Sequence, residues 1–256
     1  MLVIDKKILM FNIKEVYFSD CPVDIEDCDF IRFRYCKDKV DVKGFNRHES
    51  ITSVIDLTQD LETIWQKMDK KSTRYGINRA QRENIEVFIG ENHEIFFQMY
   101  KSFLNKKGIR SKFEIFGVGS VTLDAIKKYG TLFIAKYNDE ILAGTVYLED
   151  NSNLLAWLGF SKRFEKDKRR RMMAACANRL IDWEAIKYAK EKGIKQFNLG
   201  GLWSEEEANK DLSKKGINTF KLSFGGEILT CYSYIGIYSK IFKTLYNSYN
   251  IIKKLK

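Results

Sequence analysis

The sequence has few of the residues that build metal centres, disulfide frameworks or flexible linkers. It contains two histidines, one proline (Pro22) and five cysteines, and no Cys-x-x-Cys pair. A metal site is therefore not expected, and an odd number of widely spaced cysteines fits free thiols in a reducing compartment. No stretch is rich in serine, glycine or proline, so two lobes, if present, are expected to pack together rather than hang on a tether.

Long hydrophobic runs are also missing. No segment approaches the ~18 apolar residues of a membrane-spanning helix. The first residues lack the apolar core and small-residue cleavage site of a signal peptide. These absences predict a cytoplasmic protein.

The chain does have ample material for a packed core and an excess of positive charge. Of its 256 residues, 45% are hydrophobic and 14% aromatic, which predicts one large globular domain or two small ones. The formal net charge is +10. Such an excess favours anionic partners, namely nucleic acid, phosphorylated metabolites or an acidic membrane face, although codon bias alone also produces lysine-rich chains.

Hydrophobic periodicity predicts an α/β protein in which strands and helices follow a recognisable order. Residues 131–137, 141–148 and 153–159 read as strands, 172–192 as a long helix ended by Gly193, and 195–199 as a further strand. Strand–strand–strand–helix–strand is the core order of a GNAT-like acyltransferase fold, a mixed sheet flanked by helices. An earlier series of strands at 14–19, 29–36, 50–57 and 85–89 with helices from Thr58, at 72–82 and at 92–106 resembles a second, degenerate copy.

We therefore predict two GNAT-like lobes packed together, at residues 1–118 and 119–235. Residues 236–256 form a basic amphipathic helix, since apolar residues recur at helical spacing and its charges are all positive. Docking on the body of the protein is the favoured interpretation of this helix, and contact with an anionic membrane surface is the alternative.

Two glycine pairs and a lysine between apolar residues form the most informative motif. Gly200-Gly201 ends a buried strand, and Phe220-Lys221 precedes Gly225-Gly226. Glycine pairs at strand ends let the backbone approach a ligand where a side chain would clash. We expect these residues to line a binding site.

Two basic clusters are candidate phosphate-contacting surfaces. The first, residues 67–82, includes Arg74 and Arg79, and the second, residues 162–171, includes Arg169, Arg170 and Arg171. A solvated helix face is the usual explanation of such runs, but a helix start beside arginines also suits an anion. The segment 171–177 has no glycine where acyl-CoA enzymes of the GNAT class carry a glycine-containing pyrophosphate loop, which argues against coenzyme A.

No Ser-His-Asp or Cys-His arrangement is evident. The acids of interest are Asp182, Glu184 and Glu227, with no general base singled out among them. Trp183 lies on an apolar helix, where an aromatic residue usually packs in the core. It is also a candidate substrate-binding residue.

These motifs together resemble the Fem-type (FemABX) aminoacyltransferases, which build the interpeptide bridges of peptidoglycan. The similarity runs from about Ile51 to Glu227. It rests on Val54-Ile55-Asp56-Leu57, Arg74-Tyr75-Gly76-Ile77-Asn78-Arg79-Ala80, Trp183-Glu184-Ala185-Ile186-Lys187-Tyr188-Ala189-Lys190, Phe197-Asn198-Leu199-Gly200-Gly201 and Phe220-Lys221-Leu222-Ser223-Phe224-Gly225-Gly226-Glu227.

The resemblance implies two GNAT-like lobes and transfer of an amino acid from aminoacyl-tRNA to an amine of a cell-wall precursor. It implies that Lys221 is the cation near the reacting ester and that Phe220 shapes the channel for the tRNA 3′ end. The basic clusters correspond loosely to phosphate-binding surfaces. Two departures from the family are Asn198, where members usually carry aspartate, and the absence of a long helical arm between the lobes.

We therefore expect a monomeric aminoacyltransferase that needs no cofactor, with aminoacyl-tRNA as co-substrate. Its acceptor is a phosphorylated or lipid-linked cell-wall precursor. The alternative is an acyl-CoA-dependent N-acyltransferase of the same superfamily, and a non-enzymatic RNA- or membrane-binding module is a third interpretation.

Overall fold

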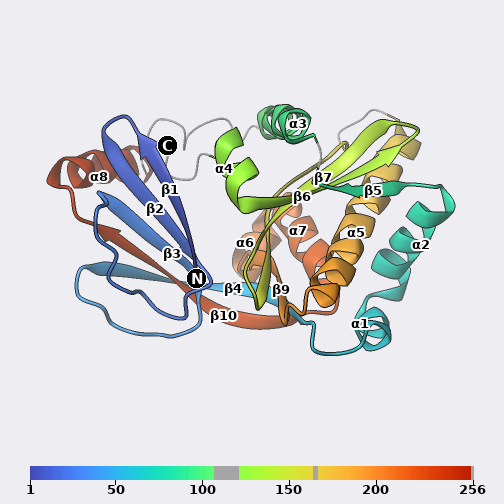
Figure 1. Cartoon of the computed structure of the whole chain (residues 1–256), viewed down its shortest axis with the longest axis horizontal. Helices are drawn as coiled ribbons and strands as arrows, with labels where there is room; N and C mark the ends of the chain where they lie inside the picture. Colours follow the sequence, from blue (N-terminus) through green and yellow to red (C-terminus); the bar gives the residue numbers. More distant parts are fainter. Residues whose placement is uncertain (91, 107–120, 164–166, 255–256) are drawn as a thin grey trace. The chain divides into compact units, whose positions relative to one another are not determined.

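The computed structural model describes residues 1–90, 92–106, 121–163 and 167–254, with side chains as far as Ser248. The chain forms two compact units (Figure 1). Within the described residues, unit 1 consists of residues 1–50 and 230–254, and unit 2 of residues 51–106 and 121–229. Strands β4 (Phe45–Asp56) and β10 (Glu227–Ile237) contribute residues to both units. Each unit is described by itself.

Unit 1 is a small mixed sheet with an apolar cluster on either face. Strands β1 (Leu2–Ile8) and β2 (Phe11–Tyr17) form an antiparallel hairpin, β2 pairs in parallel with β3 (Phe30–Cys36), and β3 pairs antiparallel with β10. Helix α8 (Lys240–Lys254) inserts Phe242 against Phe11 and Phe30 on one face. The other face buries Val16, Ile31, Phe33, Cys36, Tyr232 and Tyr234.

Unit 2 is built on a sheet in the order β4-β9-β8-β7-β6-β5. The added strands are β5 (Glu86–Ile89), β6 (Gly130–Tyr137), β7 (Glu140–Glu149), β8 (Asn153–Ser161) and β9 (Gln196–Leu202). Neighbours are antiparallel except β8 and β9, which run parallel because helix α5 (Lys168–Glu191) crosses over between them. Side chains alternate between the two faces, so Phe133 and Tyr147 point to one cluster while Leu132 and Val146 point to the other.

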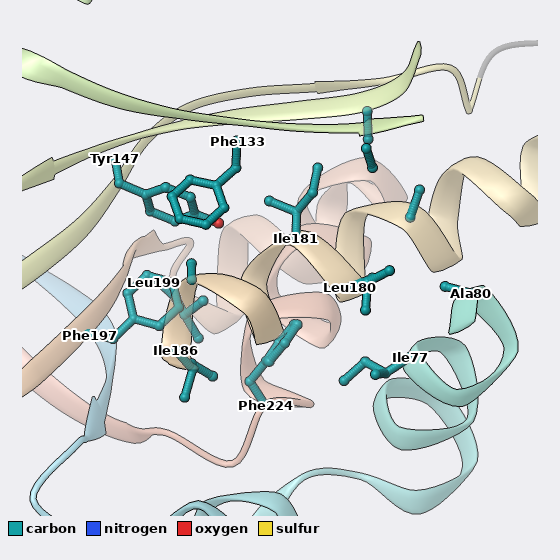
Figure 2. Packing of buried hydrophobic residues seen from close by; sticks show 14 of the residues in the cluster. Ile77, Ala80, Phe133, Tyr147, Leu180, Ile181, Ile186, Phe197, Leu199 and Phe224 are labelled. Carbon is teal, nitrogen blue, oxygen red and sulfur yellow. The ribbon is translucent and has the colours of Figure 1, made fainter. Parts of the chain in front are cut away.

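Helices cover both faces of this sheet (Figure 1). Helix α5 buries Leu180, Ile181 and Ile186 against the face that carries Phe133 and Tyr147. Figure 2 shows Ile77 and Ala80 of helix α2 (Tyr75–Arg82) on the outer side of α5. Helix α1 (Leu61–Lys67) and the π-helical turn η1 (Lys70–Arg74) precede α2. Helices α3 (His93–Lys106) and α4 (Leu123–Tyr129) cover the opposite face, and α6 (Glu205–Lys210) and α7 (Leu212–Leu222) follow β9.

The predicted order of strands and helices around α5 is confirmed. The first turn of the meander is formed by Asn138 and Asp139, which both have positive φ between β6 and β7. Gly193 follows α5 with φ +72°, as a residue just beyond a helix C-cap does. The predicted fold class, a mixed α/β fold with helices on a large sheet, is therefore confirmed. Division into GNAT-like lobes at 118/119 stays a prediction.

Other local predictions are wrong. The first helix is capped by Asp60, whose carboxylate accepts from the backbone N–H of Thr63, and not by Thr58. The second basic cluster does not precede α5, because α5 begins at Lys168 and contains Arg169, Arg170 and Arg171 in its first turns. Strand β10 continues to Ile237, so the C-terminal helix starts at Lys240 rather than at residue 236.

Candidate active site

A cavity of about 400 Å³ lies in unit 2 where β8 and β9 separate. The two strands pair only from Asn153 to Leu155 and from Gln196 to Asn198, after which the cavity opens between them. Residues 156–161 of β8 and Leu199 of β9 line it, together with side chains from α5, α7, β7 and α3. The polar and charged members of this lining are Thr145, Ser161, Arg163, Asn178, Arg179, Asp182 and Lys221.

Lys221 reaches this cavity from the last turn of α7. Its ammonium Nζ donates a hydrogen bond of 2.7 Å to the backbone oxygen of Gly201. An ammonium has three N–H groups, so two remain for a ligand. Burial lowers the pKa of Lys221 to about 8, and the nearby charge of Asp182 opposes this shift. Lys221 is therefore still mainly a cation at neutral pH.

A β-bulge in β9 aims the carbonyl of Gly201 at Lys221. The register between β4 and β9 passes from Val54↔Asn198 to Thr52↔Gly201, which leaves one extra residue in β9. Gly200 takes φ +83° there, a conformation that favours glycine, and its N–H donates to the Asn198 side chain at 2.7 Å. Neither glycine belongs to the cavity wall among the described residues. Both glycines lie inside the strand, and Gly201 positions the lysine.

Asp182 lies on the cavity side of α5 and is only 4% exposed. The hydroxyl of Tyr147, in β7, donates to its Oδ1 at 2.6 Å (Figure 2 shows Tyr147 beside α5). Burial raises the pKa of Asp182 to about 7, although the hydrogen bond from Tyr147 and the charges of Lys221 and Arg179 act in the opposite direction. The site thus holds a carboxyl and an ammonium group that both titrate near neutrality.

Arg179 and Phe220 form a second part of the cavity wall. The guanidinium of Arg179 lies 5.2 Å from the centroid of the Phe220 ring, and it donates to the backbone oxygen of Ala175 at 3.1 Å. Gly76 of α2 makes room for this side chain, since a Cβ there would lie 2.6 Å from Arg179 Cδ. Phe220 also packs edge-on against Phe224. A cation is thereby held over the aromatic ring that precedes Lys221.

The remaining predicted residues lie away from the cavity lining. Trp183 faces another side of α5, where its ring contacts Trp65 of α1 at 5.0 Å. Arg74 donates to Gln66, and Arg79 to the hydroxyl of Tyr75. Arg169 pairs with Glu83, Arg170 with Glu140, and Arg171 is exposed in the same stretch of α5. The structure brings Lys221 and Phe220 together and leaves the arginines on a paired surface.

The second glycine pair faces the protein itself. A Cβ on Gly225 would meet the backbone of Lys67, and one on Gly226 would lie 2.7 Å from the Ser53 hydroxyl. Neither this pair nor Gly200-Gly201 is part of the cavity lining among the described residues. Of the other acids, Glu184 pairs with Lys187, and Glu227 is exposed at the start of β10.

Among the described residues, no group of three or more His, Cys, Asp and Glu side chains is arranged to hold a metal ion. No helix in the described part of the chain has both the length and the apolar character that crossing a bilayer requires.

The sequence analysis names Asp182 without a role, includes Arg163 only as a member of the second basic cluster, and does not identify Tyr147 or Arg179. One signal for Asp182 was available: it interrupts the apolar run Leu180-Ile181 on a helix whose buried face includes Ala185 and Ala189. A carboxylate on a buried helix face is rarely unpartnered. Its partner Tyr147 lies 35 residues earlier, in a strand that reads simply as buried, so the pairing has no local signal.

The chain is similar to known proteins in both sequence and fold. A segment of 77 residues is 32% identical to the aminoacyltransferase FemA of Staphylococcus epidermidis. The matched segment covers 30% of this chain and 17% of that protein. The match therefore spans less than a fifth of that relative. The crystal structure of FemX superposes with a TM-score of 0.61 at 13% identity, over 95% of this chain and 85% of FemX.

The C-terminal domain of a putative lysylphosphatidylglycerol synthetase from Agrobacterium fabrum shares the fold as well, with a TM-score of 0.55 at 16% identity, over 80% of this chain and 67% of that chain. L-PGS from Bacillus licheniformis gives a TM-score of 0.51 at 16% identity, over 88% of this chain and 72% of that chain. At such identities these structures establish the fold alone. The sequence model of the FemAB family matches residues 122–254, which is just over half of the chain. The chain belongs to the FemAB family.

Proposed function

We propose that this protein is an aminoacyltransferase that moves an amino acid from aminoacyl-tRNA to an amine of a cell-wall peptide precursor. The observation that carries the proposal is the placement of Lys221, in a chain of the FemAB family, with two free N–H groups at a cavity of about 400 Å³. The similarity to FemA, an aminoacyltransferase, supports the same reaction class.

The reaction suits this set of side chains. An aminoacyl ester is already activated, so attack by an amine requires positioning and stabilisation of the developing oxyanion, and no cofactor. Lys221 is the group that supplies this stabilisation, because its ammonium is held by Gly201 and points its remaining N–H groups at the cavity. Phe220, fixed between Arg179 and Phe224, forms the wall beside the ester.

Aminoacyl-tRNA is the donor that the charge distribution favours. The net charge of +10 attracts a polyanion, and Arg163 and Arg179 place two further cations at the cavity. An acyl-CoA donor is less suited to the start of α5. The Asp167 carboxylate caps that helix by accepting from the N–H of Arg170 at 2.8 Å, where a pyrophosphate would need the same donors. Use of charged tRNA implies action in the cytoplasm.

The acceptor we propose is a phosphorylated or lipid-linked precursor of peptidoglycan, reached by a monomer at the membrane surface. Helix α8 supports peripheral contact, since Ile241 and Leu245 are exposed one turn apart on it, beside Lys240 and Lys243. Flotation with anionic and with neutral vesicles tests this part. Binding to anionic vesicles that Ile241→Ser weakens is expected, and equal recovery without vesicles would contradict it.

Transfer itself is tested with a mixture of labelled aminoacyl-tRNAs and candidate wall precursors. Formation of a labelled amide that ribonuclease pretreatment of the donor abolishes is the expected result. A parallel titration calorimetry experiment uses acetyl-CoA. Micromolar binding of acetyl-CoA with acetyl transfer to the acceptor would overturn the proposal in favour of an acyl-CoA-dependent N-acyltransferase, and RNA or vesicle binding with no transfer would favour a non-catalytic module.

A further inference from the structure

Asp182 lines the cavity and uses one of its two carboxylate oxygens in a hydrogen bond with another residue. Oδ1 accepts the hydrogen bond from Tyr147, while Oδ2 makes no hydrogen bond within the part of the chain that the structure describes. The charged groups that face Asp182 are Arg179 from α5 and Lys221 from α7, and Tyr147 faces it from β7. Neither cation lies within the 4.0 Å of an ion pair with it in the described residues. Asp182 and Lys221 therefore both line the cavity without an ion pair between them in the described residues.

Amide formation needs a group that accepts a proton from the attacking amine. Alkyl amines are mainly protonated at neutral pH, and an ammonium has no lone pair with which to attack an ester. Lys221 is itself mainly a cation there and stabilises the opposite charge. Among the described lining residues, Asp182 is the carboxylate, and the remaining polar groups are hydroxyls, an amide and guanidinium groups, which are poor proton acceptors.

We infer that Asp182 is the catalytic proton acceptor for the attacking amine, and that Tyr147 is its positioning residue. The inference rests on the proposed aminoacyl transfer and adds a residue role to it. The role follows from the Asp182 carboxylate, held by Tyr147 at the cavity that Lys221 also lines. The raised pKa of Asp182, about 7, fits the task, because a base that titrates near the working pH exchanges its proton efficiently.

The proposed step conserves protons and bonds. Asp182 Oδ2 takes one proton from the acceptor ammonium, and the neutral nitrogen attacks the ester carbonyl while Lys221 holds the oxyanion. The new C–N bond forms, the ester C–O bond breaks, and the ribose hydroxyl oxygen leaves with the second proton of the nitrogen. Asp182 then releases its proton to solvent, so one proton is produced for each amide.

The test is the rate of aminoacyl transfer in a single turnover, measured from pH 6 to 9.5 for wild type and Asp182→Asn. Asparagine keeps the size of the side chain and an oxygen that accepts from Tyr147. We expect a loss of roughly 10²–10⁴-fold at pH 7, the usual contribution of a general base. The loss should shrink about tenfold with each unit of rising pH, because the amine then loses its proton to water.

Tyr147→Phe provides an independent measurement, should Asp182→Asn fold poorly. Removing this hydrogen bond raises the pKa of Asp182 further, so the acidic limb of the rate profile should move to higher pH. A purely structural role for Tyr147 would lower the rate without moving that limb. Asp124→Asn, an exposed aspartate on α4, is the matched control and should leave the profile unchanged.

The outcomes separate this inference from the proposed function. Transfer by wild type that Asp182→Asn leaves within threefold, with the same acidic limb, overturns the role of Asp182 alone. So does an acidic limb that Tyr147→Phe does not move. Absence of transfer by the wild-type protein with every donor and acceptor overturns the proposed function and this inference with it.

Discussion

Two acidic side chains, Glu15 in unit 1 and Asp182 in unit 2, are almost fully buried, and their surroundings differ. Glu15 is 2% exposed and lies 3.0 Å from both Lys6 Nζ and Arg34 Nη2. Asp182 is 4% exposed and has a hydrogen bond from Tyr147, but no ion pair with any residue that the structure describes. Burial acts to raise the pKa of each, yet Arg34 and Lys6 bring that of Glu15 to about 2 while that of Asp182 reaches about 7.

The difference separates a structural carboxylate from one that is available for chemistry. A buried charge is costly unless partners compensate for it, and Glu15 has two cations that do so. Arg179 and Lys221 lie close enough to Asp182 to lower its pKa, but neither forms an ion pair with it among the described residues. All three side chains line the cavity. A buried ionisable group with a strongly shifted pKa in a cleft is a candidate for function, whereas a fully paired one is not.

The largest expected effect is on stability, from Glu15→Gln. This change leaves Lys6, whose side chain is 5% exposed, and Arg34 without their carboxylate. Breaking a buried pair in this way costs about 3–5 kcal/mol, which urea unfolding would measure. Because the pKa of Glu15 is lowered, its contribution is present above the ordinary value near 4.5 and is lost as the pH falls towards 2.

Asp5→Asn is the control for Glu15→Gln, since Asp5 lies in the neighbouring strand and its side chain is 61% exposed. Its effect should stay within about 0.5 kcal/mol. If both variants lose the same small amount, the contrast between a paired and an unpaired buried carboxylate has no energetic basis.

The next effect is on turnover, from Lys221→Ala. Removing one donor to an oxyanion costs about 2.7–4 kcal/mol in other acyl-transfer sites, which corresponds to a rate loss of about 10²–10³-fold. We expect the variant to fold normally, with an unchanged melting temperature, and to lose most aminoacyl transfer. Lys215→Ala, on the exposed side of the same helix, should retain full activity. An unfolded or fully active Lys221→Ala variant would contradict the assignment.

The strands around α5 could be predicted from the sequence because their signals are local. The meander from β6 to β8 alternates apolar residues between clear turns, and α5 has a long buried face that ends at Gly193. Strand β1 was missed because charged residues interrupt its short run, and β10 because its first half is exposed. Helix α7 was missed because Gly216 and Asn218 are poor helix formers, yet it is the element that carries Lys221.

The site was predictable only in part, for a physical reason. Phe220 and Lys221 stand in a contiguous motif, so a resemblance identifies them. The basic clusters were visible as composition, but composition does not reveal which cations already have carboxylate partners such as Glu83 and Glu140. The pairing of Asp182 with Tyr147 depends on how α5 packs on the sheet, which no local pattern encodes.

A smaller effect concerns the pH dependence of stability at Asp182. Because its pKa is raised from the ordinary 3.8 to about 7, its contribution to stability is present below 3.8 and is lost as the pH rises through 7. Asp182→Asn removes this dependence. The variant should gain on the order of 1–3 kcal/mol over wild type between pH 5 and pH 8, seen in melting temperatures at both values. An equal difference at both pH values would show that Asp182 does not change its charge in the folded protein.

The smallest effect is expected at the surface, from Arg169→Ala. This change removes an exposed partner of the Glu83 carboxylate, which is a third environment for a carboxylate besides those of Glu15 and Asp182. Glu83 there is partly exposed and contacts both Arg79 and Arg169, whose own side chain is 68% exposed. Water screens such a pair, so the loss of stability should stay under about 1 kcal/mol. Because Glu83 already offsets these charges, we also expect only a slight change in the affinity for tRNA and in its dependence on salt. A reduction of the salt slope by about one unit would instead mean that Arg169 contacts a phosphate in the complex, and that ion pairing in the free protein does not exclude a role in binding.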